Sequence, residues 1–290
     1  MPAPAPFADR LLAWWDHHGR KDLPWQHPRT LYRVWISEIM LQQTQVATVI
    51  PYFERWMQSF PDISTLAAAT QDEVLAHWSG LGYYARARNI HEAASICRED
   101  HGGELPKTSA ELTTLPGIGL STANAIVSQA TDTPAAVLDG NVRRVLARHT
   151  AVEGWTGKAS VQKRLWNEAE ARLPGRRGAD YTQAVMDLGA LLCTRSKPQC
   201  ADCPVSEDCR ARIENRVTGL PSPKPSTKVS SQTVVMPILR DDAGRVLLEK
   251  RPATGIWGGL WCLPAGEGLA GLSNRLGFLL EQTETLPQFE

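Results

Sequence analysis

The chain carries no excess of charge of either sign, since 31 Lys and Arg residues balance 31 Asp and Glu residues. A global electrostatic attraction to nucleic acid is therefore excluded, and any contact with DNA must come from a local arrangement of groups. No apolar run reaches the roughly 18 uncharged residues that span a bilayer, so no membrane partner is expected. The N-terminus MPAPAPFADR also lacks the basic and apolar regions of a secretion signal. We expect a cytoplasmic protein, associated with the nucleoid if the source is a bacterium.

Cysteine is scarce, with six residues among 290, and a reducing cytoplasm argues against a disulfide framework. Four of the six crowd into one segment, in the pattern C-x6-C-x2-C-x5-C, at Cys193, Cys200, Cys203 and Cys209. Closely spaced thiolates of this kind can hold a [4Fe–4S] cluster, and the alternative is a structural zinc ion. Paired C-x2-C knuckles are typical of zinc ribbons, so the uneven spacing favours the iron–sulfur cluster.

The chain divides into a long helical part and a short second part. Apolar residues recur at spacings of three and four through residues 1–214, which indicates a succession of helices. Residues 215–231 are rich in Pro, Ser, Thr and Lys without apolar periodicity, which is typical of an extended linker. Residues 232–290 open with two apolar runs around the turn at 241–244, which predict a β-hairpin in a smaller domain.

A tight glycine turn joins two short predicted helices at LPGIG, which starts at Leu115. Gly117 and Gly119 allow the backbone to approach a phosphate without interference from a Cβ atom. The amide groups that open the next helix, near Ser121, supply donors at its positive end. The turn therefore predicts a local DNA contact that needs no net positive charge.

A second basic contact is expected on the loop between the first two clustered cysteines, which carries Arg195 and Lys197. A bound cluster would pin both ends of this loop, and a pinned basic loop suits contact with phosphate. The alternative is a solvated loop that happens to be basic.

Two carboxylates occupy positions that suit acid catalysis. Glu38 has apolar neighbours one turn before and after it on a predicted helix, and burial there would raise its pKa toward that of a general acid. Asp139 precedes a predicted helix, where it can cap the amide of Val142, and the capping donors would keep it ionised. One protonated and one ionised carboxyl can act as acid and as stabiliser of a sugar cation. The alternative roles are a surface glutamate and a purely structural cap.

Six motifs carry a family resemblance, and they occur in the order EIMLQQTQVATVIPYFERW, GLGYYARARN, LPGIG, LDGNVRRVLAR, MDLGALLCTRSKPQC and WGGLWCLP. The set resembles the MutY-type adenine DNA glycosylases of the helix-hairpin-helix Gly/Pro-Asp (endonuclease III) superfamily. This resemblance implies a mainly α, two-lobed glycosylase domain over 1–214 with an iron–sulfur loop at 193–209. It also implies an incomplete small α/β domain, similar to Nudix domains, over 232–290.

The resemblance assigns roles to the site residues. It implies that Glu38 protonates the extruded adenine, that Asp139 stabilises or captures the deoxyribosyl cation, and that Asn141 supports Asp139. Gln43 and Tyr83 match positions that intercalate into the DNA stack. Three further positions resemble residues that contact adenine in its pocket: Leu23, Trp25 and Gln183.

The implied substrate is double-stranded DNA with adenine opposite 8-oxoguanine or guanine, bound by a monomer. Ser121 stands where endonuclease III enzymes have a nucleophilic lysine, so hydrolysis to an abasic site without strand cleavage is expected. Relatives continue beyond Glu290 through an element that reads 8-oxoguanine, so weakened discrimination of that base is also expected. The alternatives are an endonuclease III-like glycosylase and lyase for oxidised pyrimidines, and a non-catalytic iron–sulfur DNA-binding module.

Overall fold

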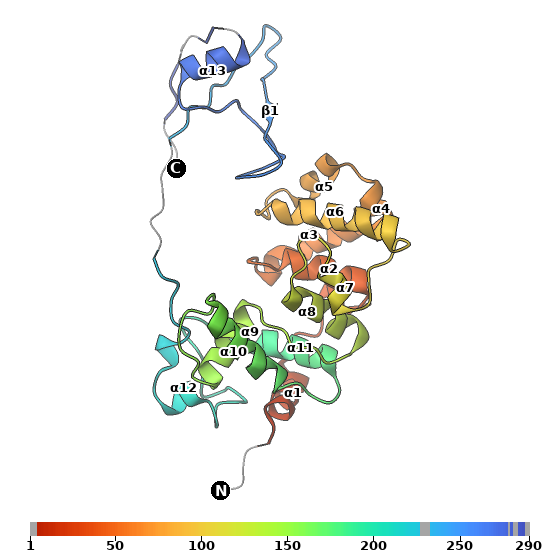
Figure 1. Ribbon diagram of the computed structural model, residues 1–290, viewed down its shortest axis with the longest axis vertical. Coiled ribbons are helices and arrows are strands. Elements are labelled where there is room, and N and C mark those ends of the chain that lie inside the picture. Colours follow the sequence, from red (N-terminus) through yellow and green to blue (C-terminus); the bar gives the residue numbers. More distant parts are fainter. Residues whose placement is uncertain (1–4, 227–232, 278, 281–283, 288–290) are drawn as a thin grey trace. The chain divides into compact units, whose positions relative to one another are not determined.

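The computed structural model describes residues 5–226, 233–277, 279–280 and 284–287. The chain forms two compact units, Met1–Pro225 and Ser226–Glu290. The named elements of the first unit are all helices, and in the second a short helix accompanies a small sheet (Figure 1). The predicted class, mainly α with a small second domain, is confirmed.

The first half of the helical unit consists of short helices joined by turns. Its elements are α1 (Phe7–His18), η1 (Pro24–Gln26), α2 (Leu31–Met40), α3 (Val46–Ser59), α4 (Ile63–Ala68), α5 (Gln71–Trp78), α6 (Ala85–Asp100), α7 (Ser109–Leu112) and α8 (Leu120–Thr131). Side chains at the helix starts explain several of these boundaries. The Thr30 hydroxyl accepts a hydrogen bond from the backbone of Arg33 at the start of α2, and Thr70 and Glu73 form a capping box on α5.

The second half of the unit continues in the same way. Its elements are α9 (Gly140–His149), α10 (Ala159–Glu170), α11 (Gly178–Asp187), the π-helical turn η2 (Leu188–Leu192), α12 (Arg210–Ile213) and η3 (Val217–Gly219). In Figure 1, α2 to α6 gather in one lobe, and α1, α9, α10 and α12 gather in another. Helices α8 and α11 pack on each other and join the lobes, because α8 contacts α2 while α11 contacts α1 and α9.

Each lobe has its own apolar core. In the first lobe, aromatic side chains from η1, α2, α3 and α5 are fully buried: Trp25, Trp35, Phe53, Trp56 and Trp78. In the second lobe, α1, α9, α10 and α11 bury a shared cluster of aliphatic residues together with Phe7, Trp15 and Tyr181. Burial of large apolar side chains supplies the main driving force for each lobe, roughly 1.5–3 kcal/mol per side chain.

The predicted linker at 215–231 begins later than its composition suggests. Leu220 is only 3% exposed, and the Ser222 hydroxyl accepts a hydrogen bond from the backbone of Gly154 at 3.2 Å. The buried Arg148 also donates to the carbonyl oxygens of Val217 and Leu220. These contacts join residues distant in the chain, so local composition could not reveal them. Residues 227–231 of the predicted linker lie outside the described residues.

The second unit contains β1 (Glu249–Lys250), β2 (Trp261–Cys262) and α13 (Leu269–Leu276). The predicted hairpin turn is present, because Asp241 accepts hydrogen bonds from the backbone of Ala243 and Arg245. Within the described part of the chain, the predicted arms meet at an isolated bridge between Arg240 and Val246, and the two-stranded sheet instead pairs β1 with β2. Among the described residues, no helix combines the length and apolar composition that crossing a bilayer requires.

Candidate active site

Glu38 lies on α2 where that helix packs against α8. The Nε2 atom of Gln129, on α8, donates a hydrogen bond of 2.7 Å to Oε1 of Glu38. Part of the residue stays accessible, but protein surrounds the carboxyl group, and this desolvation raises its pKa from 4.5 to about 7. The Gln129 hydrogen bond opposes the rise, and the negative charge of Asp139 adds to it. The expectation of a raised pKa agrees with this environment.

Asp139 caps the start of α9. Its Oδ1 accepts a hydrogen bond of 2.7 Å from the backbone N–H of Val142, as the sequence predicts. The sequence predicts that these donors keep the carboxyl ionised, and burial acts against them. Burial raises the pKa above the usual value, and the lowering contributions of the backbone amides and of Arg144 are smaller. The sequence indicated the capping donors but not the depth of burial around the carboxyl.

Ser121, in the first turn of α8, is tied to the segment that carries Asp139. Its hydroxyl accepts a hydrogen bond of 2.8 Å from the backbone N–H of Leu138. This hydrogen bond fixes Leu138, the residue immediately before Asp139, against α8. Ser121 therefore helps to position Asp139, and its side chain offers a hydroxyl group instead of an amine.

Asn141 lies two residues after Asp139, at the start of α9. Its Oδ1 accepts a hydrogen bond of 2.8 Å from Nη2 of Arg144, and the same guanidinium donates to the carbonyl oxygens of Gly189 and Cys193. A Cβ atom on Gly189 would stand 2.6 Å from Cβ of Asn141, so a glycine is required for this close approach. Arg144 and Gln129 were not singled out from the sequence, because their partners lie far away in the chain.

Gln43 and Tyr83 lie on two exposed turns of the first lobe. Tyr83 is 62% exposed and Gln43 is also exposed, so neither side chain belongs to the core. Both residues have a left-handed backbone, with φ of 59° for Gln43 and 49° for Tyr83. Such backbone strain in non-glycine residues clusters at functional sites.

The glycine turn between α7 and α8 differs in one respect from the prediction. The Leu115 side chain is buried, with 3% exposed, so only the backbone of that residue could meet DNA. Gly117 has φ of +77°, and a Cβ atom there would approach Asn89 within 2.9 Å. Gly119 caps α8 and faces open space. Gly117 and Gly119 are both exposed residues of this turn, on either side of the buried Ile118.

The residues with a predicted role in the adenine pocket are buried in the helical unit. Leu23 and Trp25 are 7% and 1% exposed, and Trp25 packs edge-on against Phe53. Gln183 is 4% exposed, and its Nε2 donates to Asp187 at 2.8 Å. All three side chains are therefore packed against other protein groups. For any of them to contact adenine, the neighbouring groups would have to move aside.

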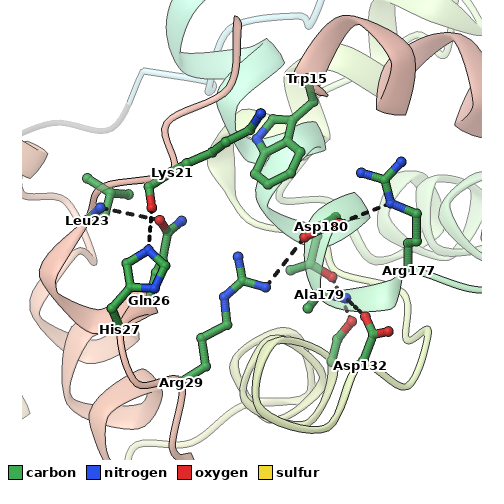
Figure 2. Close-up of polar contacts among 12 residues, drawn as sticks. Trp15, Lys21, Leu23, Gln26, His27, Arg29, Asp132, Arg177, Ala179 and Asp180 are labelled. Carbon is green, nitrogen blue, oxygen red and sulfur yellow. Dashed lines mark hydrogen bonds and ion pairs between the residues drawn. The ribbon is translucent and has the colours of Figure 1, made fainter. Parts of the chain in front are cut away.

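The loop that carries Leu23 and Trp25 is held by polar contacts, many of which Figure 2 shows. The Gln26 side chain accepts from the backbone of Leu23, and the His27 ring bonds to the carbonyl oxygen of Lys21. At the end of the loop, Arg29 pairs with Asp180 of α11. The loop is thus fixed to the helix that carries Gln183.

The four clustered cysteines line one pocket, together with residues of α9 and η2. Burial, with smaller contributions from the other three cysteines, raises the pKa of the Cys203 thiol to about 12. Within the described part of the chain, no three His, Cys, Asp or Glu side chains converge as ligands of a single metal ion would. The chemistry of four thiols around a common pocket fits a cluster, whose usual ligands are cysteine thiolates.

The backbone of the basic loop after Cys193 is held by a buried arginine of α9. The buried Arg148 of α9 donates to the carbonyl oxygens of Thr194 and Arg195, at 2.7 and 3.0 Å. The side chains of Arg195 and Lys197 remain exposed. The loop therefore presents two cations on a fixed backbone, which is the arrangement expected for contact with phosphate.

Comparison with known proteins links these features to a family. The profile described as "HhH-GPD superfamily base excision DNA repair protein" matches residues 36–171, and a NUDIX domain profile matches residues 234–289. A solved structure entitled as that of a thermostable thymine-DNA glycosylase is 27% identical, with a TM-score of 0.64, over 72% of this chain and 95% of that one. An endonuclease III in complex with DNA shares the fold at 23% identity, with a TM-score of 0.60.

Curated relatives are more similar in sequence. The adenine DNA glycosylase of Buchnera aphidicola subsp. Baizongia pistaciae is 40% identical over 258 residues, which cover 89% of this chain and 73% of that protein. The adenine DNA glycosylase of Homo sapiens is 36% identical over 312 aligned residues, which cover 89% of this chain and 57% of that protein. The chain therefore belongs to the adenine DNA glycosylase family of base excision repair proteins.

Proposed function

We propose that the protein hydrolyses the N-glycosidic bond of adenine mispaired with 8-oxoguanine or guanine in double-stranded DNA, leaving an abasic site. The observation that carries the proposal is the pair of buried carboxyls, Glu38 on α2 and Asp139 at the start of α9, which interact electrostatically across the site. Two carboxyls in different environments can divide the work of acid and cation stabiliser.

Glu38 is proposed as the general acid. Its pKa of about 7 keeps a large fraction protonated at neutral pH, and its proton is available to the departing base. Protonation of the adenine ring, at N7 by the family resemblance, weakens the bond to the sugar because the base then leaves as a neutral species. Gln129 holds one carboxyl oxygen, which leaves the other free to face the substrate.

Asp139 is proposed to stabilise the positive charge that develops on the sugar. A cationic sugar beside the carboxyl would lower its pKa by attraction of opposite charges, which offsets the burial that raises it. The amide of Val142 and the bond between Ser121 and the backbone of Leu138 hold the carboxyl in place. Asn141, fixed by Arg144, supports the same turn.

The pH dependence of excision tests the assignment of Glu38. Because the protonated form acts, the single-turnover rate constant should be constant well below pH 7, reach half its maximum near the pKa of about 7, and fall about tenfold per pH unit well above it. The measurement is a rate profile from pH 5.5 to 9 at constant ionic strength with an A:8-oxoguanine duplex. Gln129→Leu removes a hydrogen bond that favours the ionised form, so its profile should move to higher pH. A profile that rises through pH 7 would contradict the assignment.

Extrusion of adenine is proposed to depend on the exposed side chains of Gln43 and Tyr83, which would enter the stack as the base leaves it. DNA would be held by the backbone at Gly117 and Gly119 and by Arg195 and Lys197. The extruded adenine would be received beside three buried residues of the fixed loop and of α11: Leu23, Trp25 and Gln183.

Base removal is proposed to be hydrolytic because Ser121 offers no amine to attack the sugar. Borohydride added during the reaction should therefore trap little or no covalent complex between protein and DNA. The measurement is denaturing gel analysis after borohydride treatment, with strand cleavage before and after alkali on the same gel. Strand cleavage without alkali, together with efficient trapping, would favour the alternative of a glycosylase and lyase.

A [4Fe–4S] cluster is proposed to be held by Cys193, Cys200, Cys203 and Cys209. When bound, it supplies a covalent anchor for the loop that presents Arg195 and Lys197. Arg148 and Arg144 hold the backbone on the protein side of that anchor, through the carbonyl oxygens of Cys193 and its neighbours. Loss of a cysteine ligand is therefore expected to weaken the contact of Arg195 and Lys197 with DNA as well.

Metal analysis checks this ligand set. The purified protein should contain about four iron atoms per chain and absorb visible light as iron–sulfur proteins do. Cys203→Ser should lose iron and weaken DNA binding, whereas Cys262→Ser, outside the loop, should retain both. Zinc in place of iron in anaerobically purified protein would contradict the proposal.

The second unit is proposed to contact the base opposite adenine, because its sequence matches the NUDIX profile and contains the motif WGGLWCLP. Helix α13, LAGLSNRL, carries no glutamate, so we propose no nucleotide hydrolysis there. The protein is proposed to act as a monomer.

A further inference from the structure

We propose that Arg86 is a positioning residue that holds Gln43 and Tyr83 in the geometry required for base extrusion. The inference rests on the proposed function, in which those two side chains enter the DNA stack. Arg86 is the second residue of α6 and lies between the two turns that carry them.

One nitrogen of the Arg86 guanidinium holds the turn of Gln43. Its Nη1 atom donates, at 2.8, 3.1 and 2.6 Å, to the carbonyl oxygens of Ile39, Met40 and Gln42. The first two belong to the last turn of α2, where the Ile39 carbonyl also accepts a backbone hydrogen bond from Gln42, and the third immediately precedes Gln43. A cation is favourable at this end of a helix. The contact thus fixes both the turn of Gln43 and the end of the helix that carries Glu38.

The other terminal nitrogen holds the turn of Tyr83. Its Nη2 atom donates to the carbonyl oxygens of Leu81 and Gly82, at 3.3 and 3.2 Å. The guanidinium also lies over the rings of Trp78 and Tyr83, with its carbon 5.2 and 5.5 Å from the ring centroids. Trp78 is fully buried, so the arginine is clamped between the core and the exposed tyrosine.

Backbone strain explains why the two turns need this support. Gln43 and Tyr83 both adopt a left-handed conformation that non-glycine residues reach at a cost, of the kind that persists only where surrounding contacts enforce it. The carbonyl groups that Arg86 holds immediately precede both strained residues. Without those bonds, each turn would relax toward an ordinary conformation, and the directions of the two side chains would no longer be coupled.

A lysine cannot replace this arrangement. The planar fork of arginine directs Nη1 and Nη2 to two different turns at once, whereas lysine carries its donors on a single nitrogen. Arg86→Lys therefore keeps the charge and can cap α2, but it cannot hold both turns. This difference separates positioning from a general need for positive charge.

The experiment measures base extrusion and excision separately. Extrusion is followed by the fluorescence of 2-aminopurine placed opposite 8-oxoguanine, with every variant made in a Glu38→Gln background so that the base is not removed. Excision is followed by single-turnover kinetics on an A:8-oxoguanine duplex in the unmodified background. We expect Arg86→Lys to lose most of the fluorescence increase and to slow excision roughly 10- to 100-fold, with an unchanged circular dichroism spectrum.

Arg98→Lys is the matched control. Arg98 lies on the same helix and donates, at 2.8 Å, to a carbonyl at the end of another helix, Ala67 of α4, away from both turns. Its replacement should change excision by no more than about twofold. The double variant Tyr83→Ala/Arg86→Lys should be little slower than the slower single variant, because both changes disable the same turn.

The outcomes separate this inference from the proposed function. If Gln43→Ala and Tyr83→Ala slow base extrusion but Arg86→Lys extrudes and excises adenine normally, the proposed role of Arg86 is wrong. The role of Gln43 and Tyr83 as side chains that enter the DNA stack, their wedge role, then stands. If both alanine variants behave normally, the wedge role is wrong, and the inference falls with it. Additive losses in the double variant, or loss of the folded state in both Arg86→Lys and Arg86→Gln, would also overturn the inference.

Discussion

Glu38→Gln is expected to abolish adenine excision, with the single-turnover rate constant falling roughly 10³-fold or more at pH 7. The amide keeps the shape of the side chain, and its oxygen can still accept the hydrogen bond from Gln129. It has no acidic proton to transfer, so the base would have to leave as an anion. Affinity for an A:8-oxoguanine duplex should stay within a few-fold, since the contacts to phosphate are unchanged.

Quenched-flow kinetics and fluorescence anisotropy measure the two quantities for Glu38→Gln. Glu54→Gln, an exposed position on α3, is a suitable control because it removes the same charge outside the site. Full excision activity in Glu38→Gln would refute the assignment of the acid, even if adenine is the substrate. Loss of DNA binding together with activity would instead assign Glu38 a structural role at the contact of α2 and α8.

Asp139→Asn is expected to slow excision on the order of 10³-fold while α9 stays intact. Asparagine caps helices about as well as aspartate, so the bond to the Val142 amide can be kept. The substitution removes the negative charge that would stabilise the cationic sugar. Single-turnover kinetics should show the loss, and thermal unfolding should change little.

Asp62→Asn is the matched control for Asp139→Asn. Asp62 caps α4 by accepting a hydrogen bond of 2.7 Å from the backbone of Thr65, so the same chemical change is made at a cap without a catalytic role. Its excision rate should equal that of the unmodified protein. Similar losses of rate and stability in both variants would show that capping, rather than charge, explains the effect at Asp139.

Local sequence patterns predicted the parts of this site that depend on neighbouring residues. The cap at Asp139 follows from a polar residue before a helix, and the raised pKa of Glu38 follows from apolar neighbours one turn away. The helical unit followed from apolar periodicity, because each helix must bury one face. These features involve residues within about a turn of one another.

Features that depend on distant residues could not be predicted in the same way. Gln129 meets Glu38 across 91 positions of sequence, and Arg86 meets Ile39 across 47. The apolar periodicity of a sequence does not indicate which arginine side chain points inward and holds a loop. The buried position of Leu115 and the packing of Leu220 on the helical unit likewise depend on tertiary contacts. The raised pKa of Asp139 belongs to the same class, because the burial of its carboxyl outweighs the hydrogen bonds from its local donors.

The central claim is tested most directly by substrate choice under single-turnover conditions. Three duplexes are compared, with adenine opposite 8-oxoguanine, adenine opposite guanine, and thymine glycol opposite adenine, each followed by alkali and gel analysis. The proposed function predicts removal of adenine from the first two duplexes, strand cleavage only after alkali, and no reaction of thymine glycol. Excision of thymine glycol with adenine left intact would contradict it.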